Sequence, residues 1–344
     1  MSGLFARRSA ALVGLDIGSS AVKAVELETT RTGRRVVAAA AAPLPRHAIA
    51  DGAILDGDAV AGAIRGAFDA HPFRTRAVAA SLSGSDVLVR TITVPRMSDS
   101  ELDESLYWEI DQYVPVDVGD VALDYQVLDR GTDGDPDTMD VLLVVANRGR
   151  VAGLARVVER AGLVPVVVDI DALALCNAFA SNGGAGRDAV VLAHAGAGSV
   201  TAVVVRAGRP EVFRNSPLAP YLHSGRGEEP GSGEDGAFAK GGLEAPTRAA
   251  SAAAQVAREV ERAMEDCRAD VDADPIDRLV VSGGWACAPG FTDMLADRVA
   301  VPVERLEPFR GLAAAGRAGD DLLAGDAPVA AVAVGLALRR SDER

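Results

Sequence analysis

A glycine turn that follows an apolar run carries the clearest chemical signal in the sequence. Residues 12–23 read LVGLDIGSSAVK, so a carboxylate, two hydroxyls and an ammonium gather around one turn. Such a turn can cradle phosphate, because glycine lets a ligand approach the backbone and the serines offer N–H and O–H donors. The candidate contacts are Asp16, Gly18, Ser19, Ser20 and Lys23. The alternative is an ordinary hairpin whose glycine and serines only shape the turn.

The charged residues of this turn favour a role in binding. Asp16 could hold the water shell of Mg²⁺ beside the phosphates, since hard cations prefer oxygen ligands. Lys23 and Lys240 are the only lysines among 35 basic residues, so a chain that otherwise uses arginine keeps a compact ammonium here. The sequence therefore predicts a phosphate site with Asp16 as a metal contact.

Hydrophobic runs and turn residues predict the elements that position this turn. Apolar runs at 12–15, 22–27 and 36–42 are separated by turn residues, which predicts three consecutive strands. Residues 58–70 carry apolar side chains every four positions, which predicts a helix capped by Asp58.

The middle of the chain predicts a mixed α/β block. Strands are expected at 78–82, 87–94, 121–128, 139–146 and 164–168, and helices at 102–113 and 151–161. Ser98 and Glu101 form a capping box before the first of these helices. The strand at 164–168 is expected to be buried. Asp169 and Asp171 follow it as N-caps of the next helix, or as carboxyls near a cleft between domains.

A second domain with a similar succession of strands and glycine turns is expected to begin near residue 188. Strands are expected at 190–193, 199–205 and 278–281, and helices at 247–270 and 328–338. Residues 224–242 are rich in Gly, Ser and acid, which predicts a mobile loop. A strand followed by a glycine turn occurs near Asp16, Gly196 and Gly283, although no fixed-period repeat of the solenoid type is present.

Composition excludes several classes of protein. At ~150 residues per domain, 344 residues predict about two domains. The 35 basic and 49 acidic residues give a net charge of −14, which disfavours nucleic-acid binding. Three cysteines without a C-x-x-C pair predict a cytosolic protein. The apolar tracts are too short or too interrupted for a membrane span, and the N-terminus lacks a signal-peptide pattern.

The turn at 16–23 resembles the first phosphate loop of the actin-like ATPase superfamily, and the chain resembles the PilM family of type IV pilus assembly proteins. The likeness continues through WEIDQYVP at 108–115, whose tyrosine and proline distinguish that family from sugar kinases and chaperones. It covers residues 11–180 and, more loosely, 188–215 and 255–340.

This resemblance implies an α/β fold, namely a two-domain actin-like ATPase (ribonuclease H-like) fold with an FtsA-type inserted subdomain. The implied divisions are the first part of domain I at 11–76, an inserted SHS2-like subdomain at 77–165, a return to domain I at 166–187, domain II at 188–326 and a C-terminal helix of domain I at 327–344.

The resemblance also implies ATP and Mg²⁺ as cofactors. His194 stands where the family's second phosphate loop carries aspartate, and an imidazole cannot replace a carboxylate in the outer shell of Mg²⁺. Trp285 follows the adenosine turn, where it either stacks on adenine or fills its place. We therefore expect weak or lost ATPase activity and assign no catalytic residue. The further implied cofactor contacts are Gly196, Gly198, Ser199, Glu259, Arg262, Gly283 and Gly284.

The partner implied by the resemblance is the cytoplasmic N-terminal tail of a PilN-like inner-membrane protein. It would lie as an extended peptide in a groove beside the inserted subdomain. The protein would then be a cytoplasmic scaffold held at the inner membrane by its partner, in a type IV pilus or related type II secretion system, with self-association also open. Two alternatives remain: an active Mg²⁺-dependent ATPase or kinase, and an FtsA-like division protein.

Overall fold

The computed structural model describes most of the chain. The described residues are 11–84, 87–110, 120–129, 137–184, 186–218, 244–269, 275–314 and 327–341, with the backbone alone at 107–110, 129, 244–249 and 314. The predicted loop at 224–242 lies outside them, and so do the tyrosine and proline at 113 and 115.

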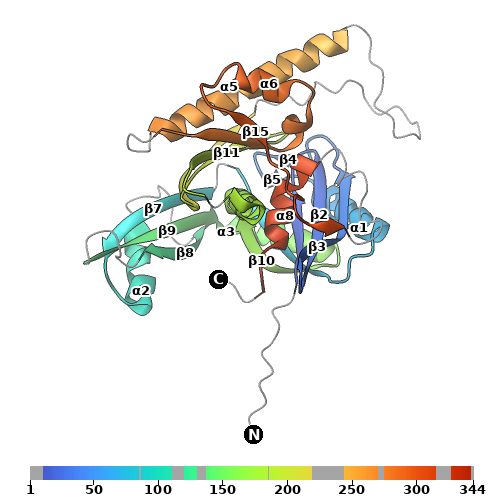
Figure 1. Ribbon diagram of the computed structural model, residues 1–344. Helices are drawn as coiled ribbons and strands as arrows, with labels where there is room; N and C mark the ends of the chain where they lie inside the picture. Colours follow the sequence, from blue (N-terminus) through green and yellow to red (C-terminus); the bar gives the residue numbers. More distant parts are fainter. Residues whose placement is uncertain are drawn as a thin grey trace.

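Two sheets built on one plan form the body of the molecule (Figure 1). The first sheet has the order β10-β6-β1-β2-β3-β16 and the second has β13-β12-β11-β14-β15. In each, three antiparallel strands are followed by two strands parallel to the first of them. The structure therefore shows an internal duplication, which relates the glycine turns near residues 18 and 196.

All the strands expected from hydrophobic runs are present, and those outside the three at 87–94, 121–128 and 139–146 lie in these two sheets. The first sheet contains β1 (Val13–Ile17), β2 (Ala21–Thr30), β3 (Gly33–Pro43), β6 (Ala77–Leu82), β10 (Val164–Ile170) and β16 (Ala313–Ala314). The second contains β11 (Ala189–Ala195), β12 (Ser199–Arg206), β13 (Arg209–Pro217), β14 (Arg278–Ser282) and β15 (Val303–Arg305). A small hairpin, β4 (Ile49–Ala50) and β5 (Ala53–Ile54), stands apart.

A third sheet and one helix form an inserted unit, seen at the left of Figure 1. Its strands are β7 (Val87–Pro95), β8 (Val121–Asp129) and β9 (Thr138–Asn147), in the order β7-β9-β8, and its helix is α2 (Asp99–Ile110). The expected domain boundary at residue 77 precedes β6, whereas β6 pairs with β1 and β10 in the first sheet. The separate sheet thus begins at Val87.

Two helices occupy the space between the two large sheets. They are α4 (Asp171–Phe179) and α8 (Ala331–Ala337), and one buried apolar cluster joins them to strands of both sheets. The outer helices are α1 (Gly57–Ala70), α3 (Arg148–Arg160), α5 (Glu244–Ala269) and α6 (Phe291–Ala296). Short helical turns cover Ala180–Gly184, Gly284–Cys287 and Ala327–Ala330.

Glycines allow α8 to approach its neighbours closely. A Cβ on Gly14 of β1 would lie 1.9 Å from the Ala333 carbonyl oxygen, and one on Gly335 would lie 1.7 Å from the Ala174 carbonyl oxygen. Both distances are far inside van der Waals contact. The backbones of β1, α8 and α4 therefore stack directly, which fixes the first residue of α4 relative to the end of β1.

The starts of α1 and α2 follow the capping rules, with one correction to the predicted cap. Ser98 and Glu101 form the expected capping box, in which Ser98 N donates to Glu101 Oε2 at 2.8 Å and Glu101 N to Ser98 Oγ at 3.3 Å. The cap of α1 is Asp56 rather than Asp58, because Asp56 Oδ1 accepts from the backbone at residues 58 and 59. Asp58 instead pairs with Arg160 of α3, at 2.7 Å.

Strand β10 contradicts the expectation of a buried strand. It lies at the edge of the first sheet, and Val164, Val166 and Val168 are 57%, 42% and 37% exposed. Pro165 and a shift of register before Val167 interrupt its pairing with β6. A proline and a bulge are common ways of blunting an edge strand.

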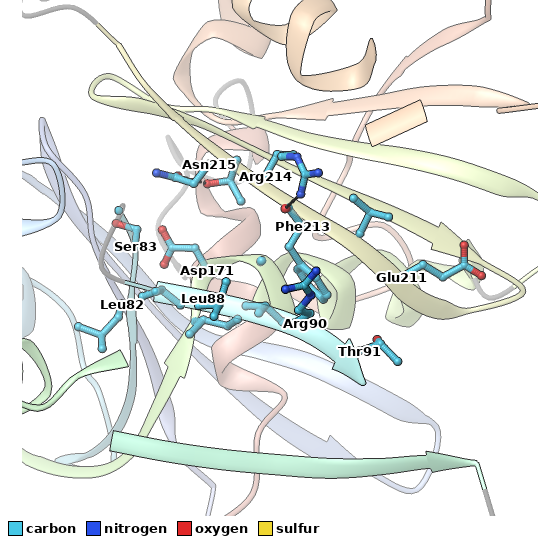
Figure 2. A pocket seen from close by; sticks show the side chains of 17 residues that line it. Leu82, Ser83, Leu88, Arg90, Thr91, Asp171, Glu211, Phe213, Arg214 and Asn215 are labelled. Carbon is cyan, nitrogen blue, oxygen red and sulfur yellow. Dashed lines mark hydrogen bonds between the residues drawn. The ribbon is translucent and has the colours of Figure 1, made fainter. Parts of the chain in front are cut away.

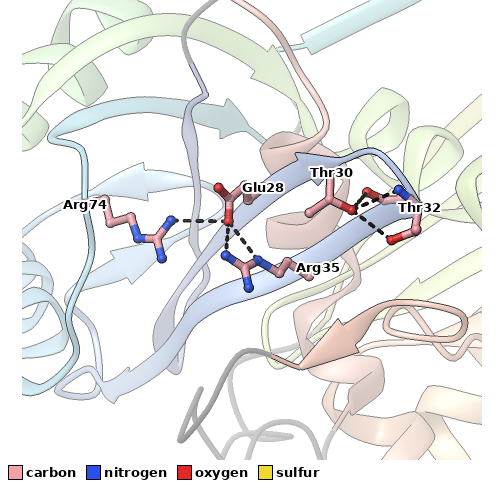
Figure 3. Close-up of polar contacts among 6 residues, drawn as sticks. Glu28, Thr30, Thr32, Arg35 and Arg74 are labelled. Carbon is pink, nitrogen blue, oxygen red and sulfur yellow. Dashed lines mark hydrogen bonds and ion pairs between the residues drawn. The ribbon is translucent and has the colours of Figure 1, made fainter.

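Polar contacts anchor the far end of the β2–β3 hairpin (Figure 3). Glu28 Oε2 accepts from Arg35 Nη2 at 2.6 Å and from Arg74 Nη1 at 3.2 Å. The Thr30 hydroxyl donates to the Gly33 carbonyl at 2.8 Å and closes the turn. These groups are partly exposed, so they position β2 more than they stabilise the fold.

No described helix has the length and apolar character that crossing a membrane requires.

Candidate functional site

The first glycine turn gathers its charged groups as the sequence predicts. Asp16 is the last residue but one of β1 and lies directly opposite Lys23 on β2, and Lys23 Nζ lies 3.1 Å from Asp16 Oδ2. Asp16 is only 4% exposed. Gly18 N donates to the Ala21 carbonyl at 3.1 Å, and a Cβ on Gly18 would lie 2.8 Å from Lys23 Nζ. The ammonium therefore covers the turn, with Ser19 and Ser20 beside it at increasing exposure.

A second carboxylate, Asp171, lies close to this pair. It is the first residue of α4 and caps no helix, since the N-terminus of α4 has no side-chain cap. Ser81 Oγ donates to Asp171 Oδ1 at 2.5 Å, and Ser83 adds a second hydrogen bond. Burial, followed by the negative charge of Asp16, raises the pKa of Asp171 to about 7. Of the two hypotheses from the sequence, helix capping by Asp171 is wrong, and its carboxyl instead lies close enough to the first glycine turn to interact with Asp16 and Lys23.

Asp169 has a different role. It is buried, it accepts from the Ile170 backbone at 2.8 Å, and its Oδ2 lies 3.5 Å from Arg339 Nε. Burial raises the pKa of Asp169, while the Arg339 charge opposes that rise. The residue therefore ties β10 to the segment after α8, and it is not the cap of α4.

The second glycine turn repeats the first with neutral groups. His194 lies opposite Thr201 and beside Ser282, as Asp16 lies opposite Lys23 in the first half. His194 Nδ1 is 3.0 Å from Ser282 Oγ. Burial lowers the pKa of His194 to about 4, and the charges of Asp16 and Lys23 also act on it. The two turns therefore lie close enough to interact electrostatically, and His194 is a neutral, hydrogen-bonded residue of the second turn.

The pH dependence of stability should reveal the neutral state of His194. Its folded pKa of about 4 lies below the ordinary 6.5, so the unfolded chain binds the proton first and stability falls as the pH drops from ~6.5 to ~4. Asp171, with a folded pKa raised from 3.8 to about 7, has the opposite slope. We expect His194→Asn to lose less stability than the wild type over this range in urea denaturation.

The control for this experiment is His47→Asn. His47 is exposed and has a φ of 67°, a conformation that asparagine tolerates. An equal change in the pH dependence of both variants would contradict the assignment.

The turn after β14 is built on Gly283. Its φ is 87°, a Cβ would lie 2.4 Å from the Ala195 carbonyl oxygen, and its N–H donates to the Pro328 carbonyl at 3.0 Å. Trp285 packs in the second domain against Phe291, with ring centroids 6.1 Å apart. This packing favours the indole filling space in the core over stacking on a base. Gly284 is exposed.

The other predicted nucleotide contacts stay predictions. Gly196 N donates to the Ser199 carbonyl at 3.0 Å, and the Gly198 carbonyl accepts from Leu218 at 2.9 Å, so these residues shape the second turn. On α5, Glu259 is half-buried, whereas the Arg262 side chain is 71% exposed and lies 3.9 Å from Asp266. Arg262 is therefore held by its own helix rather than by the turns.

The donor set fits one magnesium ion held through water and phosphate. Mg²⁺ usually keeps several waters and takes one or two carboxylates, and Asp16 with Asp171 provides two at the first turn. The described residues contain no cluster of three or more His, Cys, Asp or Glu side chains that could hold an ion without phosphate. The second turn, with His194, offers no carboxylate.

A cavity of about 490 Å³ opens between the inserted sheet and the second domain (Figure 2). Its walls are residues 82–84, 87–91, 170–172, 201 and 211–215. Asp171, which interacts with Asp16 and Lys23, and Thr201, which lies opposite His194, are thus also part of the cavity wall. Sequence patterns missed the wall at 211–215, because β13 was not predicted.

Two duplicated α/β domains that enclose paired glycine turns define an actin-like ATPase fold. The solved PilM–PilN type IV pilus biogenesis complex is similar to the chain, with a TM-score of 0.80 and 25% identity over 98% of this chain and 100% of that chain. The ethanolamine utilization protein EutJ from Carboxydothermus hydrogenoformans shares the fold, with a TM-score of 0.52 and 13% identity over 96% of this chain and 90% of its own.

Residues 14–216 and 251–341 match the family model described as type IV pilus assembly protein PilM. The chain therefore belongs to the PilM family. The family and the fold class expected from the sequence are confirmed.

Proposed function

We propose that the chain is an actin-like scaffold that docks the cytoplasmic N-terminal tail of a PilN-like inner-membrane protein. It would act in a type IV pilus, or related type II secretion, assembly complex and lie at the inner membrane through that partner. The observation that carries the proposal is the cavity beside β7, in a chain similar over 98% of its length to a solved PilM–PilN complex.

The chemistry of the cavity suits an extended peptide. Strand β7 is an edge of its sheet, so an added strand can pair with it through backbone hydrogen bonds. Val87, Val89 and Phe213 offer apolar surface within one cluster. Arg90, Arg214, Glu211 and Asp171 place charges of both signs around that surface. Backbone pairing would supply affinity, and the side-chain pockets would supply specificity.

We also propose that ATP with Mg²⁺ binds in the cleft and is turned over slowly or not at all. Lys23 would hold the phosphates, and Asp16 and Asp171 would hold the metal's water shell, on one side. When bound, Mg²⁺ would neutralise phosphate charge. The opposite side offers neutral His194 in place of a carboxylate, so one acidic partner for the metal and for water activation is missing.

Binding of a synthetic tail peptide to the protein tests the proposed scaffold function directly. The probe is a synthetic peptide of the N-terminal cytoplasmic residues of the adjacent-gene, single-pass membrane protein, with a fluorescent label at its C-terminus. We expect Val89→Asp to weaken binding roughly tenfold or more, because a carboxylate would be desolvated against the peptide. Val164→Asp is the matched control, since Val164 is 57% exposed on β10, outside the cavity.

A second variant distinguishes a loss of peptide binding from misfolding of Val89→Asp. Thr91 is an exposed cavity residue of β7, so Thr91→Trp should block the groove while the melting temperature stays near that of the wild type. Equal tail binding by the wild type and both cavity variants would contradict docking at β7. Rapid Mg²⁺-dependent phosphate release without any tail binding would support the ATPase or kinase alternative instead.

A further inference from the structure

The inserted unit is joined to the first domain by two chain crossings. The chain enters the unit after β6, through Ser83 and Gly84, and leaves it at Asn147, where β9 ends and α3 begins. The unit has an apolar cluster of its own, all of whose members lie between residues 88 and 145. A unit with its own core can turn as a rigid body about such crossings, so its orientation depends on what holds them.

The turn between β4 and β5 stacks on the entry crossing. Asp51 and Gly52 are the two central residues of this turn, with φ of 44° and 70°, and a type I′ turn requires positive φ at both. A Cβ on Gly52 would lie 2.1 Å from the Ser83 carbonyl oxygen. In return, a Cβ on Gly84 would lie 2.6 Å from the Asp51 carbonyl oxygen. The contact is therefore made backbone to backbone, with a glycine on each side of it.

The same turn is hydrogen-bonded to the exit crossing. Arg150 lies in the first turn of α3, and its Nη2 donates to the Asp51 carbonyl at 3.2 Å. The backbone N–H of Arg150 donates to Asn147 Oδ1 at 3.1 Å, so the cap of the helix holds this residue in place. The carbonyl of Asp51 thus lies against the entry crossing and accepts from the exit crossing.

The β4–β5 hairpin itself is anchored in the first domain. Ala48 and Ile49 are buried in the apolar cluster that joins β1, β6, α1 and α3. The entry crossing also reaches the cavity, because residues 82–84 form part of its wall and the Ser83 side chain is hydrogen-bonded to Asp171 (Figure 2). A displacement of this crossing would therefore change the cavity.

We propose that the Asp51–Gly52 turn is a clamp that fixes the orientation of the inserted unit on the first domain. It holds the entry and the exit of the unit at one point, and the core beneath the hairpin holds the turn. The clamp requires neither a docked tail nor bound ATP. When it is released, the unit would turn on the apolar packing of Val87, Val89 and Val144 beside α4, and the cavity would change in width.

The distance between two nitroxide labels, measured by pulsed electron paramagnetic resonance, reports this orientation. The labels are attached at Glu104→Cys on α2 and Asp69→Cys on α1, both at exposed sites. Cys287→Ala removes the half-buried native thiol. Burial raises the pKa of Cys176 and of Cys267 to about 12, so both remain protonated and unreactive. The otherwise wild-type chain should give one narrow distribution of distances.

Gly52→Ala should release the clamp, because the added Cβ would clash with the Ser83 carbonyl. We expect the distance distribution to become about twofold broader than in the wild type. Gly162→Ala is the matched control, since Gly162 has a φ of 81° and a Cβ there would meet no atom of the described residues within 4 Å. Equal broadening in both variants would trace the effect to backbone strain alone and would overturn the clamp.

Arg150→Met is a second variant, which decides the question if Gly52→Ala does not fold. It removes the side-chain donor to Asp51 and leaves the backbone N–H that bonds to the cap of α3. Its control is Arg156→Met, at an exposed site on the same helix. Broadening in Arg150→Met without broadening in this control supports the clamp. A distribution as narrow as that of the wild type in every folded variant would overturn it.

Discussion

Gly335→Ala should lower the free energy of unfolding by ~3 kcal/mol, one of the two largest effects expected for a single substitution in this chain. The added Cβ would lie 1.7 Å from the Ala174 carbonyl oxygen, and the neighbouring contact is backbone, which cannot rotate away. Helix α8 would have to move out of the space between the two sheets, where one apolar cluster contacts it from both sides. Urea denaturation at neutral pH measures the loss.

The matched control is Gly66→Ala. Gly66 is an exposed glycine of α1, and a Cβ there would meet nothing within 4 Å. Alanine has the higher helix propensity, so this variant should gain ~0.5–1 kcal/mol. If both glycines respond alike, close backbone stacking of α8 is not what holds the two halves together.

Lys23→Met should weaken ATP binding by about tenfold or more, because it removes the ammonium that lies 3.1 Å from Asp16 at the first turn. Two carboxylates would then face the phosphates. The positive charge of Lys23 also lowers the pKa of Asp171, so its loss should raise that pKa above about 7. Titration with a fluorescent ATP analogue, with and without Mg²⁺ and across pH, measures both effects.

Arg34→Met controls for the loss of one positive charge. Arg34 is exposed at the start of β3 in the same sheet, away from the first turn. Its variant should bind the nucleotide as the wild type does. Wild-type affinity in Lys23→Met would show that the glycine turn of β1 and β2 is not the phosphate site.

The difference in charge between the two glycine turns is the basis of the proposal that ATP is hydrolysed slowly or not at all. The duplicated positions hold Asp16 and Lys23 in the first half and His194 and Thr201 in the second, so a charged pair is matched by a neutral one. His194 is already bonded to Ser282, and burial keeps it neutral. The first turn is thus charged and the second is neutral, while the cavity lined in part by Asp171 and Thr201 has features that suit a peptide.

Local patterns in the amino-acid sequence were sufficient for the elements around the first turn. An apolar run, a glycine and a following run predict β1 and β2, and their antiparallel pairing then places Lys23 opposite Asp16. The capping box of α2 was equally predictable, since it involves residues three positions apart. The PilM family was also recognisable, because its motifs are short and occur in a fixed order.

Local sequence patterns did not predict features that depend on contacts between residues far apart in the chain. Strand β13 begins and ends at prolines or their neighbours and has no strong alternation, yet pairing with β12 makes it a strand. The exposure of β10 depends on its place at the sheet edge, which its valine-rich sequence does not reveal.

The sequence by itself determined the class of fold, the glycine turn with Asp16 and Lys23, and the histidine at the corresponding place in the second turn, because residue type and local spacing decide these features. Only the tertiary structure decided that Asp171 lies close enough to Asp16 to interact with it, that α8 packs directly on glycine backbone, and that the edge strands β7 and β13 border one cavity. Burial and long-range packing set those relations, and neither is encoded in any short segment.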